Sequence, residues 1–579
     1  MSKKLTSALI VVVSASLMLS ACTTDASPAA SSQGGIQTGE FGFAVNTGEA
    51  KSGGTVNVLS AVDLSHLDPA MGNDGDIRNF YRLIYRTLTT YSNEPGEGTT
   101  VVPDLATDTG TPNESATEWT FTLKDDIFYE DGTPITSGDI KYAIERSFDP
   151  AVGIGQSYHR VYLQGGDTYR GVYEDPSGLD SIKTPDDKTI IFHLNQPLPG
   201  FPNLTATSPF APVPKDGAVS TTQLDQAPIA SGPYKVESYK RGSSLTLVRN
   251  EFWSSKTDSV RPAYPDRYAF TFGLDPVTIS QRIIAGQGDD KNAMTSSTSP
   301  LQASNLSEIQ KDEYKERTVR DTPACVLYLA LNTTHEPFND MRVRQAVNFA
   351  VNKKSVQNAT GGPMMASITD DMLLPDVPGR EAFNLYETDD HAGDIDKAKK
   401  LLAAAGYENG FAVTMDVRGI PKWQAQAVAV QESLKRVGID LTLNVIDAAK
   451  YYEVIGSPTQ QAAMGITGRC SSWLSGVMIL GPLFDGDQIT DKGNLNVAQL
   501  NDPTINERFD QIMAMTDVDE QNAEFAKLNR EIMKLAPVVP LLWETSLQMV
   551  GSNLGNAFAH SGLTGYIDYT SVGLKDPEN

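Results

Sequence analysis

The chain has 579 residues and a formal net charge of −25, which argues against binding nucleic acid or an anionic membrane through a basic patch. Its hydrophobic residues (40%) and charged residues (21%) occur at the frequencies of an ordinary globular protein. A single hydrophobic core does not grow to this length, so we expect at least two lobes.

The N-terminus has the features of a secretory signal. Lys3 and Lys4 precede an apolar run from residue 5 to residue 21, and the run closes on the letters LSAC. A basic start, a short apolar core and small residues before a cleavage point are typical of such signals. LSAC is also the lipobox pattern of bacterial lipoproteins, whose cysteine carries the lipid. We predict a lipoprotein signal peptide at residues 1–21 and lipidation of Cys22; the alternative is an ordinary cleaved signal in which Cys22 has no role.

The segment that follows predicts a flexible tether. Residues 22–52 are rich in Ser, Thr, Ala and Gly and lack apolar periodicity, so they cannot bury enough surface to fold. Beyond them no hydrophobic run approaches the length of a membrane span. We therefore expect an exported protein that is anchored to the outer face of the cytoplasmic membrane through the lipid on Cys22.

The first half of the chain predicts strands with a few helices. Residues 56–58 indicate a buried strand, and residues 77–88 place apolar side chains on one helical face. Residues 119–123 alternate between apolar and polar, as a half-buried strand does. Thr136 and Asp139 form a capping box that opens another helix.

From about residue 322 the pattern changes to α/β. Residues 325–331 are a nearly continuous apolar run, as expected of a strand buried on both faces. An amphipathic helix is predicted at residues 343–351. Two units follow in which a helix stops at a glycine, Gly406 or Gly438, and a strand comes next. Such units predict crossover connections.

This organisation predicts two lobes. We expect lobe I to comprise residues 53–325 and 535–579, with an inserted subdomain at about 96–190, and lobe II to comprise residues 326–534. The returning tail creates two chain crossings, and such a pair of crossings acts as a hinge that closes around a ligand.

Two cysteines remain once Cys22 is lipidated. Cys470 is expected to end a strand of lobe II, and Cys325 to open the strand that enters it, so we predict a disulfide between them. The six histidines have no metal-ligand spacing and paired C-x-x-C motifs are absent. We predict no metal and no cofactor, although residues far apart in the sequence can still converge.

Four sequence blocks occur in order over most of the chain after the tether: WTFTLKDDIFYEDGTPITSGDIKYAIERSF, SGPYKVESYKRGSSLTLVRNEFW, LALNTTHEPFNDMRVRQAVNFAVNKKSV and DIDKAKKLLAAAGYENGFAVTM. Together they resemble the extracellular solute-binding proteins of the oligopeptide/dipeptide/nickel class of ABC importers (solute-binding protein family 5). The resemblance implies an α/β, two-lobed fold of the periplasmic-binding-protein type II, with an enlarged first lobe, a hinge and an interlobe ligand cleft.

The same resemblance implies ligand-binding residues. Asn73, Asp74 and Gly75 follow the letters LDP, where the first lobe of the family contacts its ligand. Tyr158 resembles an aromatic residue that overlies the ligand, and Trp543 lies near the returning crossing. For each of these residues the alternative is simple packing.

The segment GRCSSWLSG departs from the family pattern. In peptide-binding relatives this segment carries an Asp, followed by an aromatic residue, and the Asp pairs with the α-ammonium group of the peptide. Aligning the aromatic residue with Trp473 puts Ser472 at the position of the acid, and Arg469 adds positive charge nearby. A hydroxyl group cannot replace a charged partner in a desolvated cleft. We predict a ligand that need not have a free amino terminus; the alternatives are a misalignment or an acid supplied from elsewhere, such as Asp74.

The predicted function is that of a monomeric substrate-binding lipoprotein of an ABC importer. It would capture an oligopeptide or a peptide-like solute and deliver it to the permease subunits, without catalysis and without nucleic acid. A secreted hydrolase is the alternative from another class, but no G-x-S-x-G, H-E-x-x-H or S-x-x-K motif is present. A lipoprotein receptor that senses its ligand without transport is a further alternative, which the sequence does not separate from import.

Overall fold

A computed structural model of the protein describes residues 37–39, 41–215, 221–321, 323, 325–471, 473–563 and 565–578. The expected signal peptide, Cys22 and Ser472 lie outside the described residues. Within the described ranges, no helix combines the length and the apolar composition that crossing a membrane requires.

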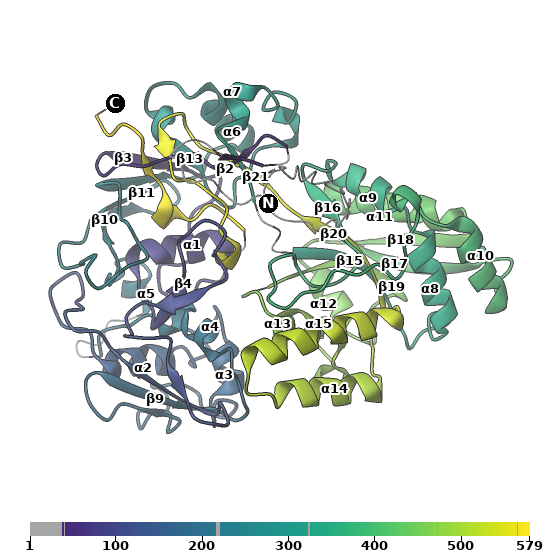
Figure 1. The fold of residues 1–579 in the computed structure, drawn as a ribbon, viewed down its shortest axis with the longest axis horizontal. Coiled ribbons are helices and arrows are strands. Elements are labelled where there is room, and N and C mark those ends of the chain that lie inside the picture. Colours follow the sequence, from purple (N-terminus) through teal and green to yellow (C-terminus); the bar gives the residue numbers. More distant parts are fainter. Residues whose placement is uncertain are drawn as a thin grey trace, which may run out of the picture. The chain divides into compact units, whose positions relative to one another are not determined.

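A five-stranded sheet forms the centre of the first lobe (Figure 1). Its order is β10-β11-β12-β3-β13, and β3 runs parallel to both of its neighbours. The strand expected at residues 56–58 is β3, whose Val56 and Val58 are fully buried. The strands are β3 (Thr55–Leu59), β10 (Tyr234–Lys240), β11 (Ser244–Arg249), β12 (Arg267–Thr271) and β13 (Ala293–Thr295).

Helix α1 (Gly75–Ile84) packs on this sheet. The ring centroid of its Phe80 lies 5.7 Å from that of Phe270 in β12, in an edge-to-face arrangement. Further elements of this lobe are α4 (Phe201–Thr205), α5 (Thr221–Leu224), α6 (Pro276–Ala285), α7 (Asp312–Lys315), β4 (Thr89–Tyr91), β5 (Val101–Pro103), β22 (Leu554–Gly555) and β23 (Gly573–Leu574).

A four-stranded antiparallel sheet, in the order β6-β7-β9-β8, forms a second layer of the first lobe. Its β7 contains Trp119 and Phe121 of the alternating pattern, and both are buried. Thr136 and Asp139 form the expected capping box: the Thr136 N–H donates to Asp139 Oδ2 over 2.8 Å, and the Asp139 N–H donates to Thr136 Oγ1 over 3.3 Å. The elements are β6 (Thr111–Pro112), β7 (Glu118–Thr122), β8 (Ile182–Lys183), β9 (Thr189–His193), α2 (Ser137–Arg146) and α3 (Tyr158–Tyr162).

A six-stranded sheet forms the centre of the second lobe, in the order β16-β20-β15-β19-β17-β18. Strand β17 is parallel to β18 and β19, and β15 is antiparallel to β19 and β20. The run at residues 325–331 is β15, in which every residue after Cys325 is buried. The strands are β15 (Cys325–Leu331), β16 (Ala366–Ile368), β17 (Phe411–Arg418), β18 (Ile439–Ile446), β19 (Met464–Cys470) and β20 (Val538–Glu544).

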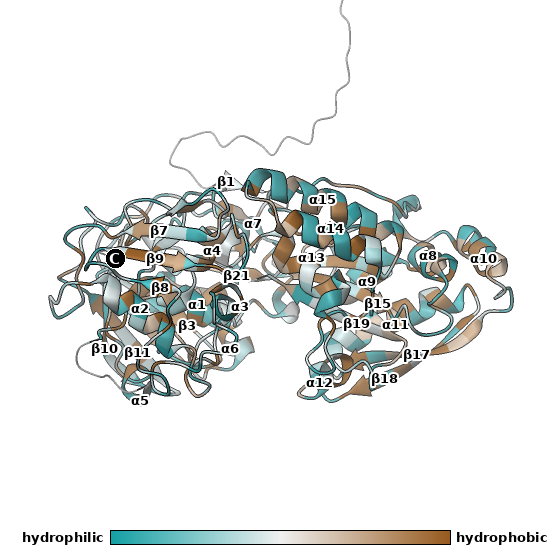
Figure 2. Ribbon diagram, turned by 90° about the horizontal axis from the view of Figure 1, so that it is seen from below, coloured by the Kyte–Doolittle hydropathy of each residue, from teal (hydrophilic) through white to brown (hydrophobic). Residues whose placement is uncertain are grey.

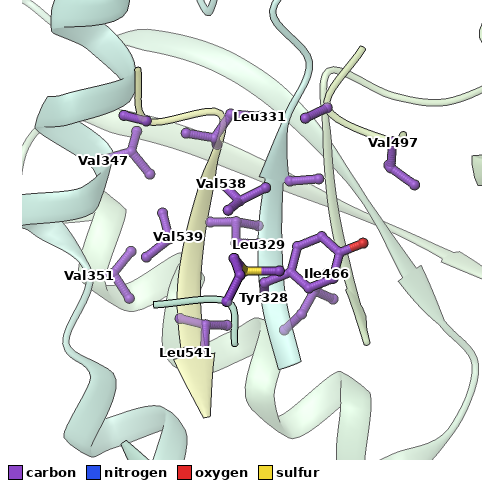
Figure 3. Packing of buried hydrophobic residues seen from close by; sticks show 14 of the residues in the cluster. Tyr328, Leu329, Leu331, Val347, Val351, Ile466, Val497, Val538, Val539 and Leu541 are labelled. Carbon is purple, nitrogen blue, oxygen red and sulfur yellow. The ribbon is translucent and has the colours of Figure 1, made fainter. Parts of the chain in front are cut away.

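Helices cover this sheet as the helix–glycine–strand units predict. The glycines after α10 and α11, Gly406 and Gly438, have positive φ angles of 89° and 86°, which let the chain leave each helix without steric strain. Figure 3 shows Val347 and Val351 beside Val539 and Leu541 of β20 in the buried core. The helices are α8 (Met341–Ala350), α9 (Lys353–Thr360), α10 (Ile395–Ala404), α11 (Pro421–Lys435) and α12 (Tyr451–Ile455).

Three further helices complete the second lobe: α13 (Gly476–Phe484), α14 (Pro503–Met513) and α15 (Val518–Lys534). Figure 2 shows α13 as largely hydrophobic, whereas α14 and α15 carry both hydrophilic and hydrophobic residues. Most residues of α13 are accordingly buried, and α14 and α15 bury only their apolar faces.

The chain passes between the lobes at two adjacent places. Strands β14 (Thr318–Arg320) and β21 (Leu547–Met549) pair in the sheet β1-β2-β14-β21, which also contains β1 (Gln37–Thr38) and β2 (Ala44–Asn46). The expectation of a flexible tether at residues 22–52 is therefore wrong for these two strands, because β2 pairs with β14 and buries Ala44. The strands that adjoin β14 and β21 in the sequence, β15 and β20, pair in the six-stranded sheet instead. The tail that we assigned to lobe I from residue 535 therefore joins that lobe only after β20, because the apolar residues of β20 are buried in the second sheet.

Asp321 and Ser546 join the two crossings. The Asp321 N–H donates to the Ser546 carbonyl oxygen over 3.0 Å, and the Ser546 hydroxyl donates to Asp321 Oδ2. The other carboxyl oxygen, Oδ1, is buried without a hydrogen-bond partner among the described residues. Burial raises the pKa of Asp321 well above its usual range.

A disulfide links β15 to β19. Cys325 and Cys470 face each other across the antiparallel pair, and their Cα atoms are 4.1 Å apart. The bond joins the first residue of β15 to the last residue of β19, which is the arrangement expected from the sequence. The end of β19 is thereby fixed to the point at which the chain enters the second sheet.

We expect the disulfide to contribute strongly to stability, because it closes a loop between residues that are 145 positions apart. In the chain-entropy model such a loop corresponds to about 5 kcal/mol. Urea unfolding should show a lower midpoint after reduction, and a variant with Cys325→Ser and Cys470→Ser should be insensitive to reductant. Two free thiols in non-reducing peptide mapping would contradict the bond.

We expect Asp321→Asn to stabilise the protein at pH 7 to 8 by about 1–3 kcal/mol, because the amide carries no charge that burial would desolvate. The native pKa of Asp321 is raised, so its contribution to stability is greatest below the ordinary pKa and falls as the pH rises through the raised value. The advantage of the variant should therefore shrink toward pH 4. Urea unfolding against pH measures this difference. Asp167→Asn, which changes an exposed carboxylate, is the control, and an equal effect of both variants would refute the assignment.

Candidate functional site

The start of α1 presents polar residues of the first lobe. Asp74 caps the helix: its Oδ1 accepts a hydrogen bond of 2.9 Å from the Ile77 N–H, and its Oδ2 accepts one of 2.6 Å from the Ser65 hydroxyl. Asn73 and Asp74 are exposed, and Gly75 is partly exposed. An N-cap carboxylate favours the helix through its dipole, so the position of Asp74 has a structural cause apart from any ligand.

Behind this helix start lies a buried polar cluster that the sequence did not indicate. Asp76 accepts hydrogen bonds from the Tyr569 hydroxyl, from the Ser297 N–H (3.2 Å) and from the Thr298 hydroxyl (3.3 Å). Burial raises the pKa of Asp76. Tyr569 lies 493 residues away from Asp76 in the chain, so no local pattern relates the two residues.

Tyr158 opens α3 and is held in place by its neighbour His159. The imidazole of His159 is buried, lies 2.8 Å from the Ser147 hydroxyl through Nε2 and packs on Phe148 at a centroid distance of 5.0 Å. Burial lowers the pKa of His159 to about 3, so the ring is neutral at physiological pH. This neutral anchor leaves the Tyr158 side chain partly exposed.

Tyr158 meets Trp473 of the second lobe. The two ring centroids are 5.1 Å apart in a T-shaped arrangement, and only 3% of Trp473 is exposed. Trp473 belongs to the hydrophobic cluster that also contains Trp119 and Phe201 of the first lobe. The Ser471 hydroxyl donates to the Trp473 carbonyl oxygen, one residue beyond the disulfide. The structure thus brings together two of the predicted residues, one from each lobe.

Arg469 and Trp543 have other partners. The Nε and Nη2 groups of Arg469 donate to the Met478 carbonyl oxygen over 3.2 and 2.7 Å. Of the five N–H donors of a guanidinium group, this carbonyl engages two. The Arg380 guanidinium lies 4.7 Å from the ring centroid of Trp543, a cation–π contact that covers one face of the indole. Trp543 Nε1 is buried with no hydrogen-bond partner in the described chain.

The site contains no metal centre in the described ranges, because no group of three or more His, Cys, Asp or Glu side chains converges there. What the described residues assemble is a pair of aromatic rings from opposite lobes, and the first lobe also exposes the polar start of α1. Such a surface can hold an organic solute by packing and hydrogen bonding.

The family described as "Bacterial extracellular solute-binding proteins, family 5 Middle" matches residues 100–491. The oligopeptide-binding protein OppA of Bacillus subtilis (strain 168) is 25% identical over 542 residues, which are 89% of this chain and 92% of that protein. The heme-binding protein A of Haemophilus influenzae is 23% identical over 465 residues, 77% of this chain and 79% of its own length.

A solved structure extends the comparison to the whole fold. The clavulanic acid biosynthesis oligopeptide binding protein 2 superposes with a TM-score of 0.86 at 32% identity, covering 94% of this chain and 98% of its own. The periplasmic-binding-protein fold expected from the sequence is therefore confirmed. On the strength of the match over residues 100–491, the chain belongs to family 5 of the bacterial extracellular solute-binding proteins.

Proposed function

We propose that this solute-binding protein captures a peptide or a peptide-like solute between its two lobes and delivers it to ABC permease subunits. Two relatives of the chain are named for oligopeptide binding, and one of them matches it over nearly its whole length. The observation that carries the proposal is the contact between Tyr158 and Trp473, which joins an aromatic residue of each lobe at one place.

The geometry supports a mechanism of closure without chemistry. A ligand that touches Tyr158 and Asn73 of the first lobe and the Gly468–Trp473 segment of the second gains contacts only when the lobes approach. The ligand therefore shifts the equilibrium toward the closed form by its differential affinity for that form. Peptide main chains are held in such clefts by hydrogen bonds, often through water.

We also infer that the ligand need not have a free amino terminus. The resemblance described above aligns Ser472, which has a hydroxyl group, with the position that it implies is an Asp in peptide-binding relatives. Asp74, the alternative acid, already accepts hydrogen bonds from the Ile77 N–H and the Ser65 hydroxyl. A capping carboxylate is less available for an ammonium group, because the cap would have to be weakened.

A lipoprotein anchor completes the proposal. Cys22 ends a lipobox after a basic and apolar start, and the sequence between Cys22 and β1 has the composition of a tether. We propose that the protein works as a monomer on the outer face of the cytoplasmic membrane, with the lipid on Cys22 holding it near its permease.

Binding of peptides should raise the melting temperature without turnover. We expect a panel of tri- to pentapeptides, each with a free and with an acetylated amino terminus, to contain ligands of both forms.

Tyr158→Ala should weaken binding at least about tenfold, as loss of a central aromatic anchor does. Tyr452→Ala, which removes an exposed tyrosine of α12, should leave affinity unchanged. Calorimetry measures affinity, and mass spectrometry of the recovered ligand measures turnover. Hydrolysis of bound peptide would refute the assignment.

The membrane-extracted protein should begin at Cys22. Mass spectrometry should find the N-terminal peptide with a lipidated cysteine, and Cys22→Ser should release the protein from the membrane fraction. A mature N-terminus at another residue, with Cys22 unmodified, would exclude the anchor while leaving the solute-binding proposal intact.

A further inference from the structure

A small cavity lies in the first lobe beside the surface that carries Tyr158. Helix α1, strand β4, residues 206–211 and Gln156 contribute to its wall, and its volume is about 50 Å³. That volume holds a few water molecules or one small polar group. Gln156 is two residues before Tyr158 in the chain, and Arg78, which also lines the cavity, interacts electrostatically with Tyr158. The cavity therefore borders the proposed ligand site.

Two of the arginines that line the cavity are already paired with carboxylates. Arg82 Nη2 lies 3.0 Å from Asp568 Oδ2. Arg261 Nη2 lies 2.8 Å from Asp104 Oδ2, and Arg261 Nη1 lies 3.0 Å from Asp258 Oδ2. All of these side chains are buried. Such short ion pairs leave neither guanidinium group in need of a further anion.

The third arginine, Arg78, also has electrostatic partners. Burial lowers its pKa, whereas neighbouring tyrosines and Asp74 raise it. Among the described side chains that line the cavity there is no Asp or Glu that could pair with a cation. A carboxylate or an ammonium group that entered would lose its hydration without meeting an unpaired opposite charge. The charges around the cavity therefore favour a neutral occupant.

The cavity nevertheless contains buried polar atoms without a hydrogen-bond partner among the described residues: Arg82 Nε, Gln156 Nε2 and Ser208 Oγ. Arg82 and Gln156 are only 7% and 3% exposed. An Nε–H or an amide N–H can donate but cannot accept, whereas a serine hydroxyl does both. Buried donors in proteins are nearly always satisfied, so these groups call for a water molecule or a ligand with an acceptor atom.

Three tyrosines, Tyr81, Tyr85 and Tyr91, contribute aromatic surface to the cavity. Each hydroxyl donates a hydrogen bond of 2.5 to 3.1 Å to an acceptor on a residue outside the lining. Their hydroxyl protons are therefore not available to an occupant, and the rings can pack against the apolar part of a side chain. The cavity thus combines apolar surface with free donors and paired charges.

We propose that this cavity is a subsite for an uncharged carboxamide of the bound solute, such as the side chain of a glutamine or asparagine in a peptide. The carboxamide oxygen accepts from Arg82 Nε–H and Gln156 Nε2–H, and its NH₂ group donates to Ser208 Oγ. A carboxylate of the same shape brings a charge that has no free partner, and an aliphatic side chain leaves the donors unsatisfied. This inference rests on the proposed peptide-binding function.

The test compares peptides that differ in one side chain. The probes are trialanine variants in which Gln, Glu or Leu replaces each alanine in turn, titrated into the full-length protein by calorimetry. At the position that enters the cavity, the Gln peptide should bind at least about tenfold tighter than the Glu and Leu peptides. The main chain and both termini are the same in every peptide, so they do not contribute to this difference.

Two variants ask whether the cavity is responsible. Gln156→Leu and Ser208→Ala each remove an unsatisfied polar group and should reduce the preference for Gln to about threefold or less. Their unfolding temperatures without ligand should stay near that of the parent, since no protein hydrogen bond is lost from these atoms. Ser181→Ala is the matched control and should keep the full preference, because the Ser181 hydroxyl is also buried and unsatisfied but does not line the cavity.

The outcomes separate the two proposals. Equal affinity for the Gln, Glu and Leu peptides at every position, or tighter binding of a Glu peptide, overturns the carboxamide subsite and leaves the peptide-binding function standing. A preference for Gln that persists in both variants, or a crystal structure of the complex with only water in the cavity, also overturns the subsite. If no peptide of the panel binds, the peptide-binding function falls, and the subsite falls with it.

Discussion

The antiparallel pairing of β15 with β20 holds the two chain crossings side by side, and the candidate site depends on this pairing. Cys325 begins β15 opposite Cys470, so the disulfide ties the end of β19 to the same point. Trp473 follows three residues later and meets Tyr158 of the first lobe. On the other side of the crossing, Asp321 and Ser546 join the two strands of chain that leave the second lobe. A rotation of one lobe about this point would therefore change the contact that Trp473 makes with Tyr158.

The sequence predicted the elements that arise from local periodicity. The capping box of Thr136 and Asp139, the buried strand β15 and the glycine-terminated helices before β17 and β18 all follow from side chains within a few positions of one another. The lobe boundary near residue 535 was misplaced. The apolar composition of β20 is that of a core strand, but only its hydrogen-bond partners show which core it joins. Local pattern specifies the strand, whereas pairing depends on contacts that are distant in the sequence.

The site was predicted less completely, for the same reason. Tyr158 and Trp473 were expected to face a ligand, and the structure shows them in contact with each other. Arg469 was expected to offer its charge, but the Met478 carbonyl oxygen engages part of its guanidinium group. The cluster around Asp76 and Tyr569 escaped prediction, since its members come from opposite ends of the chain. The type of a polar residue indicates which groups its side chain can bind. Only the fold determines which groups it already binds.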